Sequence, residues 1–351
     1  MKEYKNIRES VFYMKSVEKI ALGLFLLLFV CSSQTAFSET VDIEKCQKQV
    51  EKCTAVIDKN PNNFSSYQKR AEAEYSLGMY KEAVQDYSVV LKKYPNVSET
   101  YFMRGNAKFA IKDYKGAIAD FTKTIELEPD SVTAYCNRGT AKTSIGDFRG
   151  AIADFDKAIS LDDDIYDSYC NRGIAKLNLK DFRGALEDFN KAIKLDDSIV
   201  DGYCERAHAK AYLEDYKGAI DDFDKAIKLD SKLASAYYDR GHVKIQLNDL
   251  NGALRDFSKT IELDNKFAQA YFNRAMIEYS NKDYEKAVKD YSVYISLNPN
   301  DAEAYNNRAL SRMHIGGQTK DAVYDCLKAL KLNPEYLPKY KELPWLKYYL
   351  P

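Results

Sequence analysis

The sequence lacks an excess of charge of either sign. Its 351 residues contain 52 Lys and Arg against 53 Asp and Glu, which gives a formal net charge of −1. Proteins that bind nucleic acid usually carry a basic domain or stripe, so this balance argues against that class. With 45% hydrophobic and 30% charged residues, the chain is too apolar for a disordered protein and too charged for a multi-span membrane protein.

Residues that carry out chemistry are also scarce. The chain has three His, no glycine-rich phosphate loop, and no Ser/His/Asp or Cys/His cluster on a rigid turn. We therefore expect no enzymatic activity and no cofactor. Tyr is abundant instead, with 28 residues against a single Trp, a bias that indicates a unit copied many times.

The N-terminal region has the pattern of an export signal. Residues 20–31 are twelve uncharged residues that follow Lys19, and a bilayer span needs about 20. Small residues then occur within 36–38, as at a signal-peptidase site. We predict a signal peptide over residues 1–38, with Met14 as an alternative start, and a periplasmic or secreted protein. The alternative is an uncleaved signal that anchors the chain in the membrane.

The rest of the chain repeats with a period of 34 residues, the feature to seek first in any sequence. A Tyr heads each unit and an Arg follows it three residues later. The tyrosines are Tyr67, Tyr101, Tyr135, Tyr169, Tyr203, Tyr237, Tyr271 and Tyr305, and the arginines are Arg70, Arg104, Arg138, Arg172, Arg206, Arg240, Arg274 and Arg308. Gly or Ala comes directly after each Arg, and Ala and an Asp–aromatic pair recur later in the unit.

Each unit contains two apolar stripes with helical spacing, separated by a short polar break. An Asp recurs where the second helix needs its N-cap, at Asp113, Asp147, Asp181, Asp215, Asp249 and Asp283. We expect the small residue after each Arg to face the small Ala of the second helix, so that the two backbones approach closely. The pattern predicts a helix-turn-helix repeated eight times.

These residues and their period resemble the tetratricopeptide repeat (TPR) family. The resemblance implies an all-α, right-handed α-solenoid, or superhelix, with terminal capping helices. It places a capping helix in residues 39–63, repeats over 64–334 and a C-terminal cap over 335–351. The repeats start near residues 64, 98, 132, 166, 200, 234, 268 and 302.

The recurring Arg and Asp have two interpretations. A row of arginines can bind anions, or each Arg can pair with an Asp within or between repeats. The two residue types recur together without an excess of Arg, and a packed interface tolerates charges that are paired. We therefore favour a structural ladder of ion pairs.

The family pattern assigns partner binding to a concave groove lined by the first helices. The residues at groove positions are Phe102, Asn106, Cys136, Asn137, Asp167, Cys170, Asn171, Asp201, Cys204, Glu205, His208, Tyr238, Asp239, His242, Phe272, Asn273, Asn306 and Asn307, with Glu303 at an equivalent position. None of these is Lys or Arg. We refer to the first eighteen as the wall residues.

The wall residues favour one kind of partner. Family members that bind chaperone tails hold a C-terminal carboxylate with basic residues, but Phe102, Asp167 and Asn171 stand at those positions, which argues against such binding. We expect an extended neutral or basic peptide, with the acidic wall residues facing its cations and the Asn residues its backbone. The alternative is an acidic surface that only faces water.

The cysteines do not predict disulfides, although an exported protein is expected to form them. Cys136, Cys170 and Cys204 occupy equivalent positions in stacked repeats, about 10 Å apart, whereas a disulfide needs Cα atoms within about 7 Å. A weaker hypothesis is a zinc-like site formed by Cys204, His208, Asp239 and His242. Its spacing matches no established metal motif.

The leading hypothesis is a non-enzymatic scaffold that binds partner proteins in the groove, in an envelope or secretion assembly. One alternative is a self-assembling structural protein whose repeats stack end to end. Another is a metal- or thiol-handling protein that uses the Cys and His residues. The aromatic, basic tail over 340–351 is expected to cap the last repeat, and the alternative for the tail is docking in another copy. A membrane is expected only during export or through an uncleaved anchor.

Overall fold

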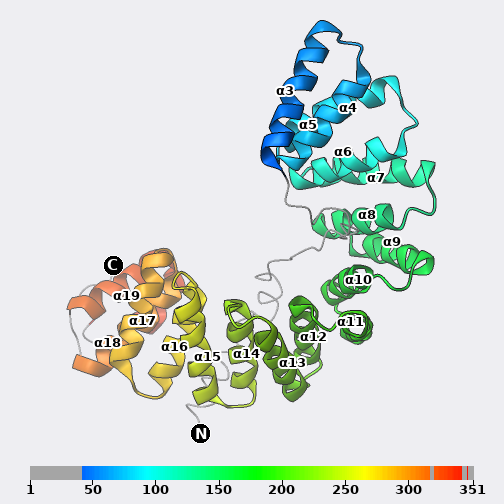
Figure 1. The fold of residues 1–351 in the computed structure, drawn as a ribbon. Helices are drawn as coiled ribbons and strands as arrows, with labels where there is room; N and C mark the ends of the chain where they lie inside the picture. The colour runs from blue at the N-terminus through cyan, green and yellow to red at the C-terminus, as the bar shows by residue number, and fades with distance from the viewer. Residues whose placement is uncertain (1–41, 317–319, 342–345, 347–351) are drawn as a thin grey trace. The chain divides into compact units, whose positions relative to one another are not determined.

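The computed structural model describes residues 42–316, 320–341 and 346, and all of its described secondary structure is helical (Figure 1). The signal-peptide prediction lies outside these residues. The chain divides into two compact units, with a boundary between residues 209 and 210. Within residues 42–316 and 320–341, no helix has the length and apolar character needed to cross a bilayer.

Eight helix pairs follow one another along the chain, and we number them repeat one to repeat eight. The first helices are α4 (Phe64–Ser76), α6 (Ser98–Ala110), α8 (Val132–Ser144), α10 (Tyr166–Asn178), α12 (Val200–Tyr212), α14 (Ala234–Gln246), α16 (Ala268–Ser280) and α18 (Ala302–Gly316). The second helices are α5 (Tyr80–Lys93), α7 (Tyr114–Leu127), α9 (Phe148–Leu161), α11 (Phe182–Leu195), α13 (Tyr216–Leu229), α15 (Leu250–Leu263), α17 (Tyr284–Leu297) and α19 (Lys320–Leu332).

Additional helices lie at both ends of this array. Helix α3 (Ile43–Lys59) packs on α4 through the buried Cys53 and Ile57. After α19 come the short helices η1 (Pro334–Tyr336) and α20 (Leu337–Lys341). Tyr340 and Leu346 are buried in the same apolar cluster as residues of the last two repeats, so this segment covers the end of repeat eight.

Most of the second helices begin with an Asp cap. The sequence pattern predicted the Asp, and the structure shows which amide it binds. In repeats two to six the N-cap Asp accepts a hydrogen bond from a Gly amide three residues later, at 2.8–3.0 Å. A Cβ at Gly150 would lie 2.2 Å from an Asp147 oxygen, so the Gly leaves room for the carboxylate in the position that it takes here. Asp283 forms no such bond, and its carboxylate pairs with Lys286 at 3.1 Å.

The Gly after the ladder Arg in repeats three and four has a different neighbour from the one expected. A Cβ at Gly139 would lie 2.8 Å from the ring of Phe155, and Gly173 has the same relation to Phe189 at 2.7 Å. Both rings are fully buried. At these positions the glycine therefore accommodates a phenylalanine ring of the second helix, which lies nearer to it than the Ala that was expected. In repeat one the small residue Ala71 and the second-helix Ala83 do belong to the same buried cluster.

The predicted Arg–Asp ladder is confirmed, and it connects elements in two directions. Arg138 donates from Nε and Nη2 to the two carboxylate oxygens of Asp154, at 2.9 and 2.6 Å, within its own repeat. Its Nη1 donates to Thr122 of the preceding second helix at 3.1 Å, and its guanidinium lies 5.5 Å from the Tyr135 ring centroid. The same backward bond joins Arg70 to Thr54 of α3. Equivalent Arg–Asp pairs form in repeats one, two, four, six, seven and eight, so in these repeats, as in repeat three, the Tyr–Arg–Asp set joins the two helices and fastens them to the preceding element.

The ladder predicts a large effect from removing one buried partner. Asp154 is 3% exposed and accepts from Arg138 and from Lys142 at 2.7 Å. Asp154→Ala is expected to lower the free energy of unfolding by about 3 kcal/mol, because it leaves two largely buried cations without their carboxylate. Urea unfolding followed by circular dichroism measures this loss.

The matched control is Glu126→Ala, which breaks the exposed Lys123–Glu126 pair. The free energy of unfolding of this variant should fall by less than about 0.5 kcal/mol, since solvent and salt screen exposed pairs. Equal losses in the two variants would contradict a structural role for the ladder.

Candidate functional site

The wall residues lie on seven first helices, α6 to α18, and differ in exposure. Ten are partly exposed: Phe102, Asn106, Asp167, Asp201, Cys204, Glu205, Tyr238, Asp239, His242 and Asn307. The other eight are buried: Cys136, Asn137, Cys170, Asn171, His208, Phe272, Asn273 and Asn306. The buried eight present no surface to a partner, so any binding face consists of the exposed ten.

The buried amides connect successive first helices. Asn137 of α8 donates to Asn106 Oδ1 of α6 at 2.8 Å. At the equivalent position in α16, Asn273 lies 2.8 Å from His242 Nε2 and donates to the Tyr238 hydroxyl at 3.0 Å. These amides were expected to bind peptide backbone. The structure instead shows them bonded within the protein, because a buried amide requires partners.

Two cysteines of the wall are also structural. Cys136 Sγ lies 3.0 Å from Ser168 Oγ of the next first helix, and Tyr166 donates to Cys170 Sγ at 3.4 Å. Burial raises the pKa of the Cys170 thiol well above its usual range. The six cysteines of the described residues carry thiols and form no disulfides. A buried thiol with a raised pKa is a poor nucleophile and metal ligand, which argues against thiol handling at this position.

The proposed zinc-like site finds no support in the geometry. Among the described residues, no group of three or more His, Cys, Asp or Glu side chains is placed to hold a metal ion. His208 lies 3.5 Å from Glu205, whereas His242 packs against the Tyr238 ring at 4.6 Å. Burial lowers the pKa of His242 to about 4, so this imidazole is neutral at physiological pH.

The exposed part of the wall is acidic. Asp201 and Glu205 lie one turn apart on α12, and Asp167 occupies the position equivalent to Asp201 on α10. Burial, together with the charge of Glu205, raises the pKa of Asp201. The carboxylates therefore repel one another in a partly dry setting, and a cation brought close to them would relieve that repulsion.

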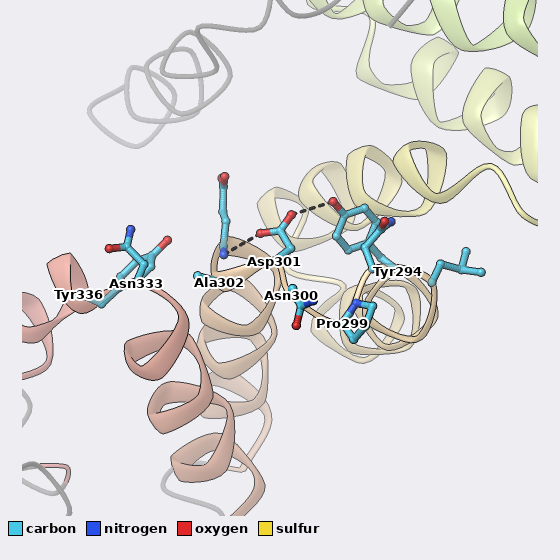
Figure 2. A pocket seen from close by; sticks show the side chains of 10 residues that line it. Tyr294, Pro299, Asn300, Asp301, Ala302, Asn333 and Tyr336 are labelled. Carbon is cyan, nitrogen blue, oxygen red and sulfur yellow. Dashed lines mark hydrogen bonds between the residues drawn. The ribbon is translucent and has the colours of Figure 1, made fainter.

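A second acidic feature is a cavity of about 600 Å³ at the C-terminal end of the array (Figure 2). Tyr294 of α17, Asp301 and Glu303 at the start of α18, and Tyr336 of η1 line it. Tyr294 donates to Asp301 Oδ2 at 2.7 Å, while Asp301 Oδ1 accepts from the Glu303 amide at 2.8 Å. The lining contains two carboxylates and no Lys or Arg.

Burial and the two neighbouring carboxylates shift the pKa values of the groups that line this cavity. Burial and the neighbouring Asp301 raise the pKa of Glu303, and burial with the same two carboxylates raises that of Tyr336 to about 12. Of the lining residues, Glu303 was predicted from its groove position, whereas Asp301, Tyr294 and Tyr336 were not predicted. No sequence signal pairs them, because Tyr336 belongs to the C-terminal segment and reaches the cavity only through tertiary packing.

Comparison with known families now identifies the architecture. Models described as tetratricopeptide repeat match residues 65–96, 98–131, 132–165, 166–198 and 238–302, and one described as TPR repeat matches 207–246. The chain belongs to the TPR family. TPR proteins are in general protein-interaction scaffolds and not enzymes. A comparison with curated proteins found no match.

Solved TPR structures share the fold. The C-terminal part of a TPR repeat-containing protein from Cytophaga hutchinsonii is 20% identical, with a TM-score of 0.55 over 68% of this chain and 97% of that one. A TPR protein from Parabacteroides merdae is 16% identical, with a TM-score of 0.54 over 77% and 99%. YrrB, described as a TPR protein with an unusual peptide-binding site, is 24% identical, with a TM-score of 0.45 over 52% and 95%.

The burial of Cys170 in this TPR array predicts low reactivity. In the native protein Cys170 is expected to resist alkylation by iodoacetamide, because its thiol is enclosed and its pKa is raised. The half-buried Cys46 of α3 should react first, and both should react in urea. Mass spectrometry of the modified peptides measures this order. Native alkylation of Cys170 as fast as Cys46 would restore thiol handling as an alternative.

Proposed function

We propose that this TPR protein is a scaffold that holds an extended, basic segment of a partner protein along its first helices. The observation that supports the proposal is the division of the wall: its amides and cysteines are largely buried, whereas all of its carboxylates are partly exposed. Asp167, Asp201 and Glu205 therefore present negative charge on two neighbouring first helices of one unit. A positively charged segment complements this surface and gains speed and specificity of association from it.

The cavity beside Tyr294 and Tyr336 provides a second point of attachment in the other unit. A Lys or Arg side chain placed there would face Glu303 and Asp301 and contact two phenol rings, which attract cations through their π faces. Each unit then offers one acidic position to the same class of segment. We infer that side-chain charge, not a terminal carboxylate, determines which partner binds.

The first test selects peptides from a random display library on the protein, without its export signal. Selected sequences should be enriched in Lys and Arg, and their affinity should fall as salt is added. The triple variant Asp167→Lys, Asp201→Lys, Glu205→Lys should weaken binding at least tenfold, about 1.4 kcal/mol, because attraction becomes repulsion. Fluorescence anisotropy with a selected basic peptide measures the affinity.

The matched control is Asp163→Lys, Glu187→Lys, Asp197→Lys, which makes the same charge change at exposed positions that are not wall residues. Its affinity should change less than threefold. Glu303→Gln is an additional variant, and it should weaken the binding of those selected basic peptides that use the cavity. Selected peptides without basic enrichment, or equal effects of the two triple variants, would refute the proposed surface.

We propose further that the protein acts outside the cytoplasm, in an envelope or secretion assembly. This rests on the short apolar stretch over 20–31 and the small residues in 36–38. The expected mature chain begins at Glu39. Mass spectrometry of the protein from its native cell measures the N-terminus, and an intact N-terminus in the cytoplasmic fraction would rule out export through a cleaved signal.

A further inference from the structure

One position in the repeat changes its charge sign along the array. It lies four residues after each ladder Arg, near the C-terminal end of the first helix. The residues at this position are Glu74, Lys108, Lys142, Lys176, Lys210, Lys244, Glu278 and Arg312. Repeats two to six therefore carry Lys, repeat eight carries Arg, and repeats one and seven carry Glu.

Where the residue is Lys, it completes the ladder. Each ammonium lies 2.7–2.8 Å from the ladder Asp of its own repeat, the pairs being Lys108–Asp120, Lys142–Asp154, Lys176–Asp188, Lys210–Asp222 and Lys244–Asp256. Lys142 and Lys176 are also within about 3.4 Å of a carbonyl in the next helix. The lysines therefore neutralise the Asp and connect the two helices of one repeat.

Glu reverses this arrangement in repeats one and seven. Glu74 is 5% exposed and Glu278 is 8% exposed, so neither carboxyl is hydrated like a surface group. In both residues Oε2 is buried and forms no hydrogen bond. Glu74 Oε1 lies 3.7 Å from Arg70 Nε, too far for a hydrogen bond, and Arg70 is already engaged with Asp86. An ionised carboxylate in such a position would be costly.

The charged groups around each Glu do not compensate for it. Asp86 and Glu82 of α5 face Glu74 with negative charge, against Arg70 on its own helix. Around Glu278 the groups are Asp290, Asp283 and Lys286 of the second helix and its N-cap, with Arg274 on its own helix. In both repeats the nearest Arg is bound to the ladder Asp. The largest effect on the pKa of each Glu is desolvation, and the second largest is repulsion from the ladder Asp of its own repeat.

We propose that Glu74 and Glu278 are held as neutral, proton-carrying carboxylic acids in the folded array, so that repeats one and seven loosen when the pH rises past neutrality. The lysine-containing repeats between them do not respond in this way. Repeats one and seven also lack the side-chain cap of the second helix, at Met79 and Asp283. They therefore have fewer local bonds to offset the loss of the proton.

The direction of the effect follows from linkage. Burial and the ladder Asp raise the pKa of both Glu74 and Glu278 to about 7, whereas an unfolded Glu titrates near pH 4.3. A raised pKa means that the folded repeat binds the proton more tightly than the unfolded one. The resulting stabilisation is fully present below about pH 4.3 and is lost as the pH rises through about 7.

Hydrogen exchange tests the proposal repeat by repeat in the full chain. Amide protection in α4–α5 and α16–α17, corrected for the intrinsic exchange rate, should fall about tenfold between pH 6 and pH 8. The isosteric variants Glu74→Gln and Glu278→Gln should remove this pH dependence and raise protection at pH 8. Glu74→Lys, which introduces an ion pair with Asp86, should do the same.

The control variant is Lys142→Gln, the same replacement at the same position of repeat three. It should lower protection of α8–α9 at both pH values, since Asp154 loses one of its cations. His314 stacks on Tyr284 of repeat seven and is retained in Glu278→Gln, so the comparison with that variant removes its contribution. A carbon-13 titration of the two Glu carboxyls gives the pKa values directly.

Two results would overturn the proposal. One is carboxyl pKa values near 4 in the folded protein. The other is an equal effect of Glu74→Gln and Glu278→Gln on protection at pH 6 and pH 8. Either would mean that both groups are ionised throughout, with the cost of their burial met by some other contact.

Discussion

The bond between each ladder Arg and its Asp is the interaction on which the array depends. The guanidinium reaches both helices of its own repeat and the second helix of the repeat before it, while the Tyr three residues earlier contacts its face. A helix pair of this size cannot bury its apolar face alone and is stable only when its neighbours are fastened to it. The same ladder explains why Tyr and Arg recur at fixed spacing.

The ladder also determines what remains for a partner. Cations needed for the ladder point between the helices, and the amides on the first helices bond to the preceding repeat, as Asn137 does to Asn106. The wall retains carboxylates such as Asp167 and Asp201 without basic residues among them. The positively charged side chains of the ladder are thus paired between helices, and the carboxylates of the wall give the remaining surface a negative charge.

Repeats one and seven show how one residue changes this arrangement. Lys142 neutralises Asp154, but Glu74 adds a second buried carboxyl beside Asp86. The fold tolerates this because burial raises the pKa of the second carboxyl, which then takes up a proton and becomes neutral. Stability that depends on a proton is a property of two repeats and not of the array as a whole.

The sequence by itself determined the all-α fold, the phase of the repeats and the presence of Arg–Asp ion pairs, because a 34-residue period places equivalent residues in equivalent surroundings. That Arg138 pairs with Asp154 of its own repeat was decided by the structure. Local pattern also located the caps at Asp113 and Asp147. Tertiary structure alone decided which wall residues reach solvent and which pack against a neighbouring helix. Asn137 and Asp167 both occupy groove positions in the sequence, but Asn137 is buried and Asp167 is partly exposed. It also brought Tyr336 to Asp301 and left Glu74 buried, because burial depends on packing between elements that no single stretch of sequence contains.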